Sequence, residues 1–205
     1  MFANATMNSR IAKNLYHQGW AMQADYFDPL LIGQLAAEAT QLYQTNLMTR
    51  ASIGRGDLLH QNLSIRRDFI HWLNHDSKSQ QQYQSLMETL RQSLNESLYL
   101  GLFEFEAHYA VFEAGAFYKK HLDSFRGNAN RIVSVVVYLN ADWPDAGGGE
   151  LLIYAADGSG VELQRIRPKA GTLVVFLSEE MPHEVNVTHH QRASIAGWFK
   201  LNVHR

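Results

Sequence analysis

The feature of this sequence that most constrains its fold is a change of pattern near Glu104. Beyond this residue, short β-branched and aromatic runs alternate with turns that contain Gly, Asn or Asp, at a spacing of about ten residues. The GGG at 147–149 and the DGSG at 157–160 are read as such turns. The runs predict strands at 103–112, 117–121, 131–139, 150–154, 161–166, 172–177, 184–187 and 192–201. Many short strands of this kind, preceded by helices, indicate a sandwich or jelly roll.

The first hundred residues predict helices instead. Asp28 followed by Pro29 is a good N-cap and first helical position, and a helix is expected over 29–46. A second helix is expected after Asp76, because Tyr83, Leu86, Leu90, Leu94 and Leu98 form a one-sided apolar stripe. The intervening stretch, 51–73, is expected to be a β-hairpin or a loop. The chain is thus predicted to be one α+β domain, 1–205, with about 1–100 as a mainly helical support and about 101–205 as the jelly-roll core.

Charge and composition restrict the partners and the chemistry. The formal net charge of -2 provides no basic surface for nucleic acid or an anionic membrane. The absence of Cys excludes disulfides, zinc-thiolate sites and Cys nucleophiles, so His and carboxylates are the plausible metal ligands. No signal-peptide core and no apolar run of membrane-spanning length is found in the sequence. We therefore expect a soluble, cytoplasmic protein that acts on small molecules or proteins.

A metal site is suggested by the HLD triplet at 121–123. His121 and Asp123 stand two residues apart, so both project from the same face of an extended segment. The best third candidate is His183, which follows Pro182 just after an apolar strand. Two His and one carboxylate occupy one face of an octahedral ion and leave three open positions, as in non-haem iron(II) oxygenases. His108, His189 and His190 are not expected to be ligands.

A possible anion site follows nine residues after His183. In an extended strand Arg192, Ser194, Ala196 and Trp198 share one face. If that face points into a barrel, the buried guanidinium needs a bidentate carboxylate partner. A dicarboxylate cosubstrate would supply it.

Five segments, in this order and at these separations, carry a family resemblance: YKKHLDSF, RIVSVVVYLNADW, GGGELLIY, RIRPKAGTLVVFLSEEMPHEV and RASIAGWF. Over roughly residues 100–201 the chain resembles the prolyl 4-hydroxylase branch of the 2-oxoglutarate oxygenases, and most nearly the bacterial relatives of the oxygen-sensing prolyl hydroxylases. SIRRDFIHWL near 64–73 is weakly similar to an R-x-D segment on the substrate side of that group. The resemblance implies a double-stranded β-helix with the N-terminal helices packed on one sheet.

The resemblance also implies roles for individual residues. His121, Asp123 and His183 match the iron ligands, and Arg192 matches the residue that pairs with the distal carboxylate of 2-oxoglutarate. Tyr138 matches a tyrosine that hydrogen-bonds the same carboxylate, although a buried strand tyrosine is also an ordinary core residue.

Two further matches concern the substrate. Arg131 and Trp198 match residues at the substrate entrance. Trp198 is equally explained by packing, and Arg131 and Tyr138, seven apart, would face opposite ways in an ideal strand. Phe112 departs from the pattern, because the oxygen-sensing enzymes tend to carry Tyr there, and this puts cosubstrate contacts on that strand in question.

The implied activity is an Fe(II)- and 2-oxoglutarate-dependent dioxygenase that consumes O2, with ascorbate as an optional further cofactor. The favoured substrate is a prolyl residue in a protein, with an elongation-factor-like target as one candidate. Two alternatives stay open: hydroxylation of a free amino acid or other small molecule, and a non-catalytic binding module of cupin type. The complete set of three ligands and Arg192 favours the enzyme over the binding module.

Overall fold

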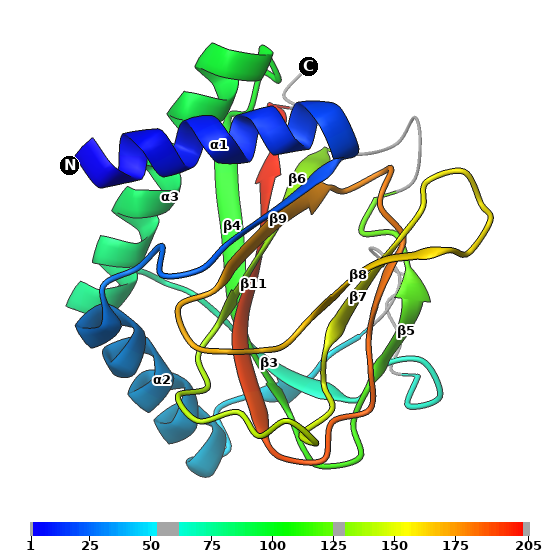
Figure 1. Ribbon diagram of the computed structural model, residues 1–205. Helices are drawn as coiled ribbons and strands as arrows, with labels where there is room; N and C mark the ends of the chain where they lie inside the picture. The colour runs from blue at the N-terminus through cyan, green and yellow to red at the C-terminus, as the bar shows by residue number, and fades with distance from the viewer. Residues whose placement is uncertain (1, 53–61, 125–129, 203–205) are drawn as a thin grey trace.

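The computed structural model describes residues 2–52, 62–124 and 130–202, and it shows two antiparallel sheets facing each other with helices on the outside of the larger one (Figure 1). In chain order the elements are α1 (Phe2–Gln18), β1 (Trp20–Gln23), α2 (Pro29–Gln44), β2 (Thr49–Arg50), β3 (Asp68–Trp72), α3 (Lys78–Leu98), β4 (Glu104–Phe112), β5 (Tyr118–His121), β6 (Arg131–Tyr138), β7 (Leu151–Tyr154), β8 (Glu162–Ile166), β9 (Leu173–Leu177), β10 (His183–Val185) and β11 (Arg192–Lys200). The larger sheet has the order β1-β9-β6-β11-β4-β3-β2, and the smaller has β5-β10-β7-β8. This is the predicted α+β architecture.

The two predicted helices form because their ends are capped and one face is apolar. The Asp28 side chain accepts a hydrogen bond of 2.7 Å from the Leu30 amide at the start of α2. Ser77 caps α3 in the same way, through the Gln80 amide. The α3 residues Tyr83, Met87, Leu90 and Leu94 are fully buried against the larger sheet and its neighbouring helices.

The stretch 51–73, expected to be a β-hairpin or a loop, contributes one strand, β3, whose partner β2 lies just before it. β2 and β3 pair antiparallel, and β3 continues the larger sheet by pairing with β4 along its whole length. The chain between these two strands includes 53–61, which lie outside the described residues.

The predicted strands of the second half are all present, within two residues of the expected bounds. α1 and β1 are additions to the prediction. In α1 the buried residues are Asn8, Ile11, Ala12 and Leu15, and β1 extends the edge of the larger sheet by pairing with β9. The first hundred residues therefore supply three strands of the larger sheet as well as the helices.

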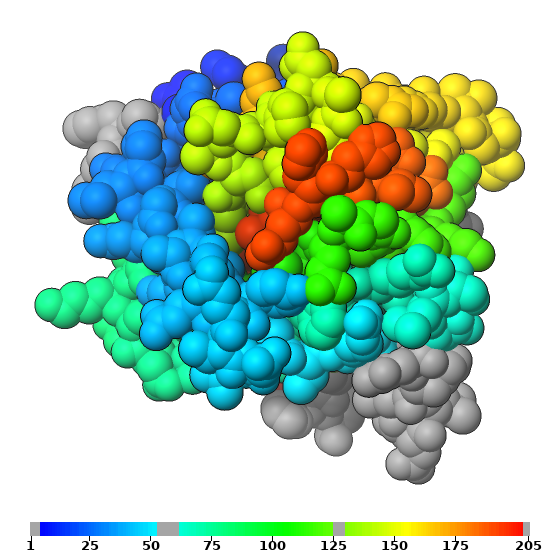
Figure 2. All heavy atoms as spheres, turned by 90° about the horizontal axis from the view of Figure 1, so that it is seen from below, coloured from blue at the N-terminus to red at the C-terminus, as the bar shows by residue number. Residues whose placement is uncertain are grey.

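The buried apolar side chains form two clusters. One lies between the helices and the larger sheet, and the other fills the space between the two sheets. Seen from below, segments from each third of the chain meet on one face: α2 in blue, the end of β4 in green and the segment leading into β11 in orange-red (Figure 2). No helix in the described ranges is long and apolar enough to cross a membrane. Between the sheets, the second cluster surrounds polar residues that form a site.

Candidate metal centre

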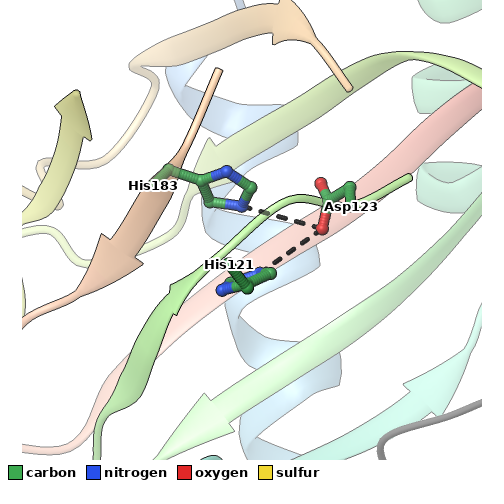
Figure 3. A group of neighbouring side chains, drawn as sticks. All are labelled: His121, Asp123 and His183. Carbon is green, nitrogen blue, oxygen red and sulfur yellow. Dashed lines mark ion pairs between the residues drawn. The ribbon is translucent and has the colours of Figure 1, made fainter. Parts of the chain in front are cut away.

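The three predicted metal ligands lie together in the structure (Figure 3). His121 ends β5 and stands directly opposite His183, which begins β10, in the smaller sheet. Asp123 lies two residues beyond the end of β5, and its Oδ1 is 3.5 Å from Nε2 of His121 and 3.6 Å from Nε2 of His183. All three ligand atoms lie within 4.8 Å of one another. No second group of this kind is found among residues 2–52, 62–124 and 130–202.

Backbone carbonyls orient both imidazole rings. Nδ1 of His121 is 2.7 Å from the Lys119 carbonyl oxygen, and Nδ1 of His183 is 3.0 Å from the Met181 carbonyl oxygen. Because a carbonyl only accepts hydrogen bonds, each Nδ1 carries a proton, and Nε2 is the nitrogen of each ring that faces Asp123. This is the tautomer that a metal ligand requires.

The protonation states also suit a divalent cation. Burial, aided by the nearby His121, lowers the pKa of His183 to about 4, so His183 is neutral near pH 7. Burial by itself raises the pKa of Asp123, but the polar groups around it, which include the Ser134 hydroxyl that donates to Oδ2, outweigh burial and hold that pKa below its ordinary value. Imidazole binds a metal in its neutral form, so two such ligands and one carboxylate would leave a bound dication with net positive charge.

A stack of side chains supports the ring of His121. The rings of Tyr118 and His121 are parallel to within 17°, with centroids 3.6 Å apart. The guanidinium of Arg66 lies 4.7 Å above the Tyr118 ring and makes a bidentate ion pair with Asp68, at 2.6 and 2.8 Å. Arg66 and Asp68 are the R-x-D residues of the sequence, whereas Tyr118 was not singled out by sequence reasoning.

The triad opens into a cavity of about 890 Å³ between the two sheets. Arg192, Ser194, Ala196 and Trp198 all line it, as strand alternation predicts for β11. Phe112, at the end of β4, also lines the cavity, with its ring 5.0 Å from Cζ of Arg192.

Arg192 is a buried cation without an anionic partner in the described part of the chain. Its side chain donates through Nε to the Gly149 carbonyl at 2.9 Å and through Nη1 to the Ser194 hydroxyl at 3.2 Å. Burial lowers the pKa of Arg192. The hydroxyl of Tyr138, whose ring lies 5.1 Å from Cζ of Arg192, is buried and makes no hydrogen bond. A buried cation without an anionic partner beside a buried hydroxyl without a hydrogen bond favours an anionic acceptor that both can reach.

Comparison with known proteins identifies the family. Residues 107–200 match the family model described as "2OG-Fe(II) oxygenase superfamily". The crystal structure of a Pseudomonas putida prolyl-4-hydroxylase is 38% identical in sequence, with a TM-score of 0.86 over 95% of this chain and 99% of that one. The chain belongs to the 2OG-Fe(II) oxygenase superfamily. Fe(II), 2-oxoglutarate and O2 are the requirements of this family.

Other prolyl hydroxylases and Egl nine proteins are similar at lower sequence identity. Egl nine homolog 1 from rat is 33% identical over 86 residues, which are 42% of this chain, and the human protein matches equally. The chain spans only about a quarter or less of the length of these relatives, since the match covers 25% of the rat protein and 20% of the human one. A Trichoplax adhaerens prolyl hydroxylase in complex with a peptide of hypoxia inducible factor shares the fold, with a TM-score of 0.85 and 23% identity over 97% of this chain and 90% of that one.

The donor set of this oxygenase fits the cofactors of its family. Two imidazole nitrogens and a single carboxylate oxygen converge with their lone pairs available, which suits Fe(II). The uncompensated charge of Arg192 and the unpaired hydroxyl of Tyr138 suit the far carboxylate of 2-oxoglutarate.

The structure corrects one expectation about the oxygenase cavity. Arg131 was expected to face away from Tyr138, but Arg131 lines the cavity between the two sheets and Tyr138 packs in the apolar cluster between the same sheets. A register shift between Phe199 and Lys200 on β11 leaves Arg131 opposite Lys200 and Val133 opposite Phe199, so one extra residue of β6 is accommodated and the alternation reverses. Arg131 then lies 3.7 Å above the Trp198 ring.

Sequence reasoning set His108 aside, and the metal group does not include it. It nevertheless lines the cavity, where its ring contacts Trp198 with centroids 5.5 Å apart. Burial, aided by the charge of Arg66, lowers the pKa of His108 to about 4. His189 lies outside the site and contacts the Ala146 carbonyl. Strand alternation on β4 is the signal that could have placed His108 in the cavity, because Phe112 shares its face.

Proposed function

We propose that this chain is an Fe(II)- and 2-oxoglutarate-dependent dioxygenase that hydroxylates a prolyl residue in a protein substrate. The observation that carries the proposal is Arg192, a buried cation without an anionic partner among the described residues, which lines the same cavity as His121, Asp123 and His183. The buried Tyr138 hydroxyl, which has no hydrogen-bond partner, belongs to the side chain whose ring lies 5.1 Å from Cζ of Arg192. The similarity to a prolyl-4-hydroxylase along nearly the whole chain supports the choice of proline. The Trichoplax adhaerens relative binds a peptide, which supports a protein substrate.

The position of each residue suggests its role in binding the metal or the cosubstrate. Nε2 of His121, Oδ1 of Asp123 and Nε2 of His183 would hold Fe(II). Arg192 and Tyr138 would pair with the far carboxylate of 2-oxoglutarate, and Ser194 keeps the guanidinium in place. When bound, iron, 2-oxoglutarate and O2 supply the oxidative decarboxylation that yields succinate and CO2 and inserts one oxygen atom into a substrate C–H bond.

The walls of the cavity orient the cosubstrate and exclude water from it. Apolar side chains that include Leu151, Phe176 and Val185 surround the triad. In this low-dielectric surrounding, the pairing of Arg192 with a carboxylate is stronger than it would be in water. The 2-oxoglutarate is therefore held in one orientation relative to the metal ligands.

Arg131 and Trp198 are proposed to contact the substrate at the entrance of the cavity. Arg131 donates to Glu106 at 2.7 and 2.9 Å, and Glu106 also accepts from Lys200 at 3.0 Å. Lys200 also pairs with Glu104 at 2.7 Å, so two carboxylates balance the two cations in this part of the cavity. An apolar prolyl ring would meet the aromatic surface of Trp198 without confronting an uncompensated charge.

The remaining parts of the proposal concern location, domain organisation, ascorbate and the target protein. We propose that the protein works in the cytoplasm as a single domain, that ascorbate supports its activity, and that an elongation factor is one candidate target. They follow from the family resemblance and from the composition, and each is open to direct test.

The test is an incubation of the purified chain with Fe(II), ascorbate, 2-oxoglutarate and a purified elongation factor, followed by peptide mass spectrometry and a succinate assay. We expect succinate together with the added mass of one oxygen atom on a proline. A His121→Ala protein is the control, because it lacks a metal ligand. Succinate formed only with free amino acids would favour the small-molecule alternative. Absence of any metal-dependent 2-oxoglutarate binding would favour a cupin-like binding module.

A further inference from the structure

The two carboxylate oxygens of Asp123 have different environments. Oδ1 faces the Nε2 atoms of both His121 and His183. Oδ2 points the other way and accepts two hydrogen bonds, from the Ser134 hydroxyl at 2.6 Å and from the Trp198 indole Nε1 at 2.9 Å. Both donors come from side chains that are at most 6% exposed. Only one oxygen of Asp123 is therefore directed at the metal position.

The two donors are held by the larger sheet rather than by flexible segments. Ser134 on β6 and Trp198 on β11 are directly opposite each other in the ladder, so their side chains project from the same face toward Asp123. The guanidinium of Arg131 lies 3.7 Å from the centroid of the Trp198 ring, on the ring face, and restrains the indole. The donors have little freedom to follow Asp123 if it turns.

A second serine fixes the direction of the Ser134 hydroxyl. Ser178, which directly follows β9, has its Oγ 2.8 Å from Oγ of Ser134 and is fully buried. Because the single hydroxyl proton of Ser134 is donated to the ionised Asp123, Ser178 must donate to Ser134. The result is a chain of hydrogen bonds, Ser178 to Ser134 to Asp123, in which each bond strengthens the next.

We infer that Ser134 and Trp198 are positioning residues that hold Asp123 so that it binds the metal through Oδ1 alone, with Ser178 supporting Ser134. A carboxylate can bind a cation through one oxygen or through two. If Oδ2 also turned toward the metal, it would occupy one of the three positions that 2-oxoglutarate and O2 require. The inference rests on the proposed function for its metal, and it gives Trp198 a role other than substrate contact.

The experiment measures Mn(II) binding, as a substitute for Fe(II), and then 2-oxoglutarate binding to the Mn(II) protein, both by calorimetry. Ser134→Ala and Trp198→Phe each remove one donor while keeping most of the side-chain volume. Loss of a hydrogen bond to a metal ligand typically weakens metal binding by about 10- to 100-fold. We expect a loss of this size in each variant and a larger loss in the double variant. Ser134→Thr, which keeps the hydroxyl, should recover most of the affinity.

Two matched controls separate positioning from general stability. Ser79→Ala removes a hydrogen bond from a buried serine to the Glu38 carboxylate, far from the triad. Trp143→Phe removes the indole hydrogen bond to the Gly148 carbonyl. Both should lose stability without losing Mn(II) affinity.

A spectroscopic measurement reports the coordination directly. The visible absorption of the Co(II) protein depends on the number of ligands, so in the double variant it should shift if Asp123 turns to bind through both oxygens. Wild-type Mn(II) affinity and an unchanged Co(II) spectrum in both single variants would overturn the inference, as would equal losses in the two controls. If one variant does not fold, the other decides. If the wild-type protein itself binds no Mn(II) and no 2-oxoglutarate, the proposed function fails instead.

Discussion

Replacing Arg192 with Met should separate cosubstrate binding from stability. Arg192 is 1% exposed, and two of its five N–H groups are used, by Gly149 and Ser194. Three N–H groups are left for a carboxylate, enough for the bidentate pairing that a guanidinium prefers. Methionine fills a similar volume but offers no donor and no charge.

The expected loss of affinity follows from the burial of the pair. Removing one partner of a buried, hydrogen-bonded charge pair costs about 2–5 kcal/mol, which corresponds to a weakening of 2-oxoglutarate binding from about 30-fold to several thousand-fold. The ligand-free protein should respond in the opposite direction. Because its Arg192 has no anionic partner among the described residues, Arg192→Met removes an uncompensated buried charge, and the protein should be at least as stable as the wild type.

The assay is calorimetric titration of 2-oxoglutarate into the Mn(II) protein under nitrogen, with thermal unfolding of the metal-free protein alongside. Arg167→Met is the matched control, because Arg167 is a half-exposed arginine paired with Asp145 at the surface. It should leave the dissociation constant unchanged. A change of less than about threefold in Arg192→Met, well below the range expected for a buried pair, would refute the assignment of Arg192 to the cosubstrate.

Three further predictions test neighbouring features. Tyr138→Phe should weaken 2-oxoglutarate binding about 10- to 100-fold in the same titration, because it removes one hydrogen bond to a charged group. It should not destabilise the ligand-free protein, in which the Tyr138 hydroxyl makes no hydrogen bond. Unchanged affinity would show that Tyr138 is a core residue only. Because the pKa of His108 and that of His183 fall to about 4 in the folded state, below the ordinary value of 6.5, the unfolded chain binds more protons between these values, and stability should fall as pH drops from about 6.5 to 4. Denaturant titrations should show a shallower fall in His108→Leu, and an equal slope would contradict the neutral, buried state of that ring. Gly149→Ala should lower stability by about 1–3 kcal/mol, because Gly149 has a φ of +67°. It should also lower 2-oxoglutarate affinity, because an added Cβ would lie 3.1 Å from Cδ of Arg192. Wild-type stability in chemical denaturation together with wild-type affinity in calorimetry would refute this prediction.

Much of the fold could be predicted because its signals are local. α2 and α3 have caps and apolar stripes within their own sequences, and the later strands are separated by regular turns. α1 and β1 lack such signals. In α1, the buried Asn8 accepts a hydrogen bond from Tyr26, eighteen residues away. The strand β1 is a four-residue edge strand whose backbone pairs with β9.

In the site, too, some positions could be predicted from local sequence signals and others could not. Strand alternation placed Arg192 and Trp198 on one face, and the structure has both in the cavity. Alternation failed for Arg131, because a single extra residue in a β-bulge reverses the facing of everything beyond it. Tyr118 was missed because its contact with His121 is a ring stack, which leaves no periodic trace in a four-residue strand.

The chemistry could be predicted from the residues alone: no Cys, an imidazole and a carboxylate two residues apart, a later His, and an Arg on a predicted strand. Which of these groups meet depends on the tertiary fold. The pairing of β5 with β10 brings His183 to His121, and the pairing of β6 with β11 brings Ser134 and Trp198 to the far oxygen of Asp123, 75 residues before Trp198. Such contacts depend on which strands pair and in what register, and register is set by the packing of whole faces rather than by any short stretch of sequence.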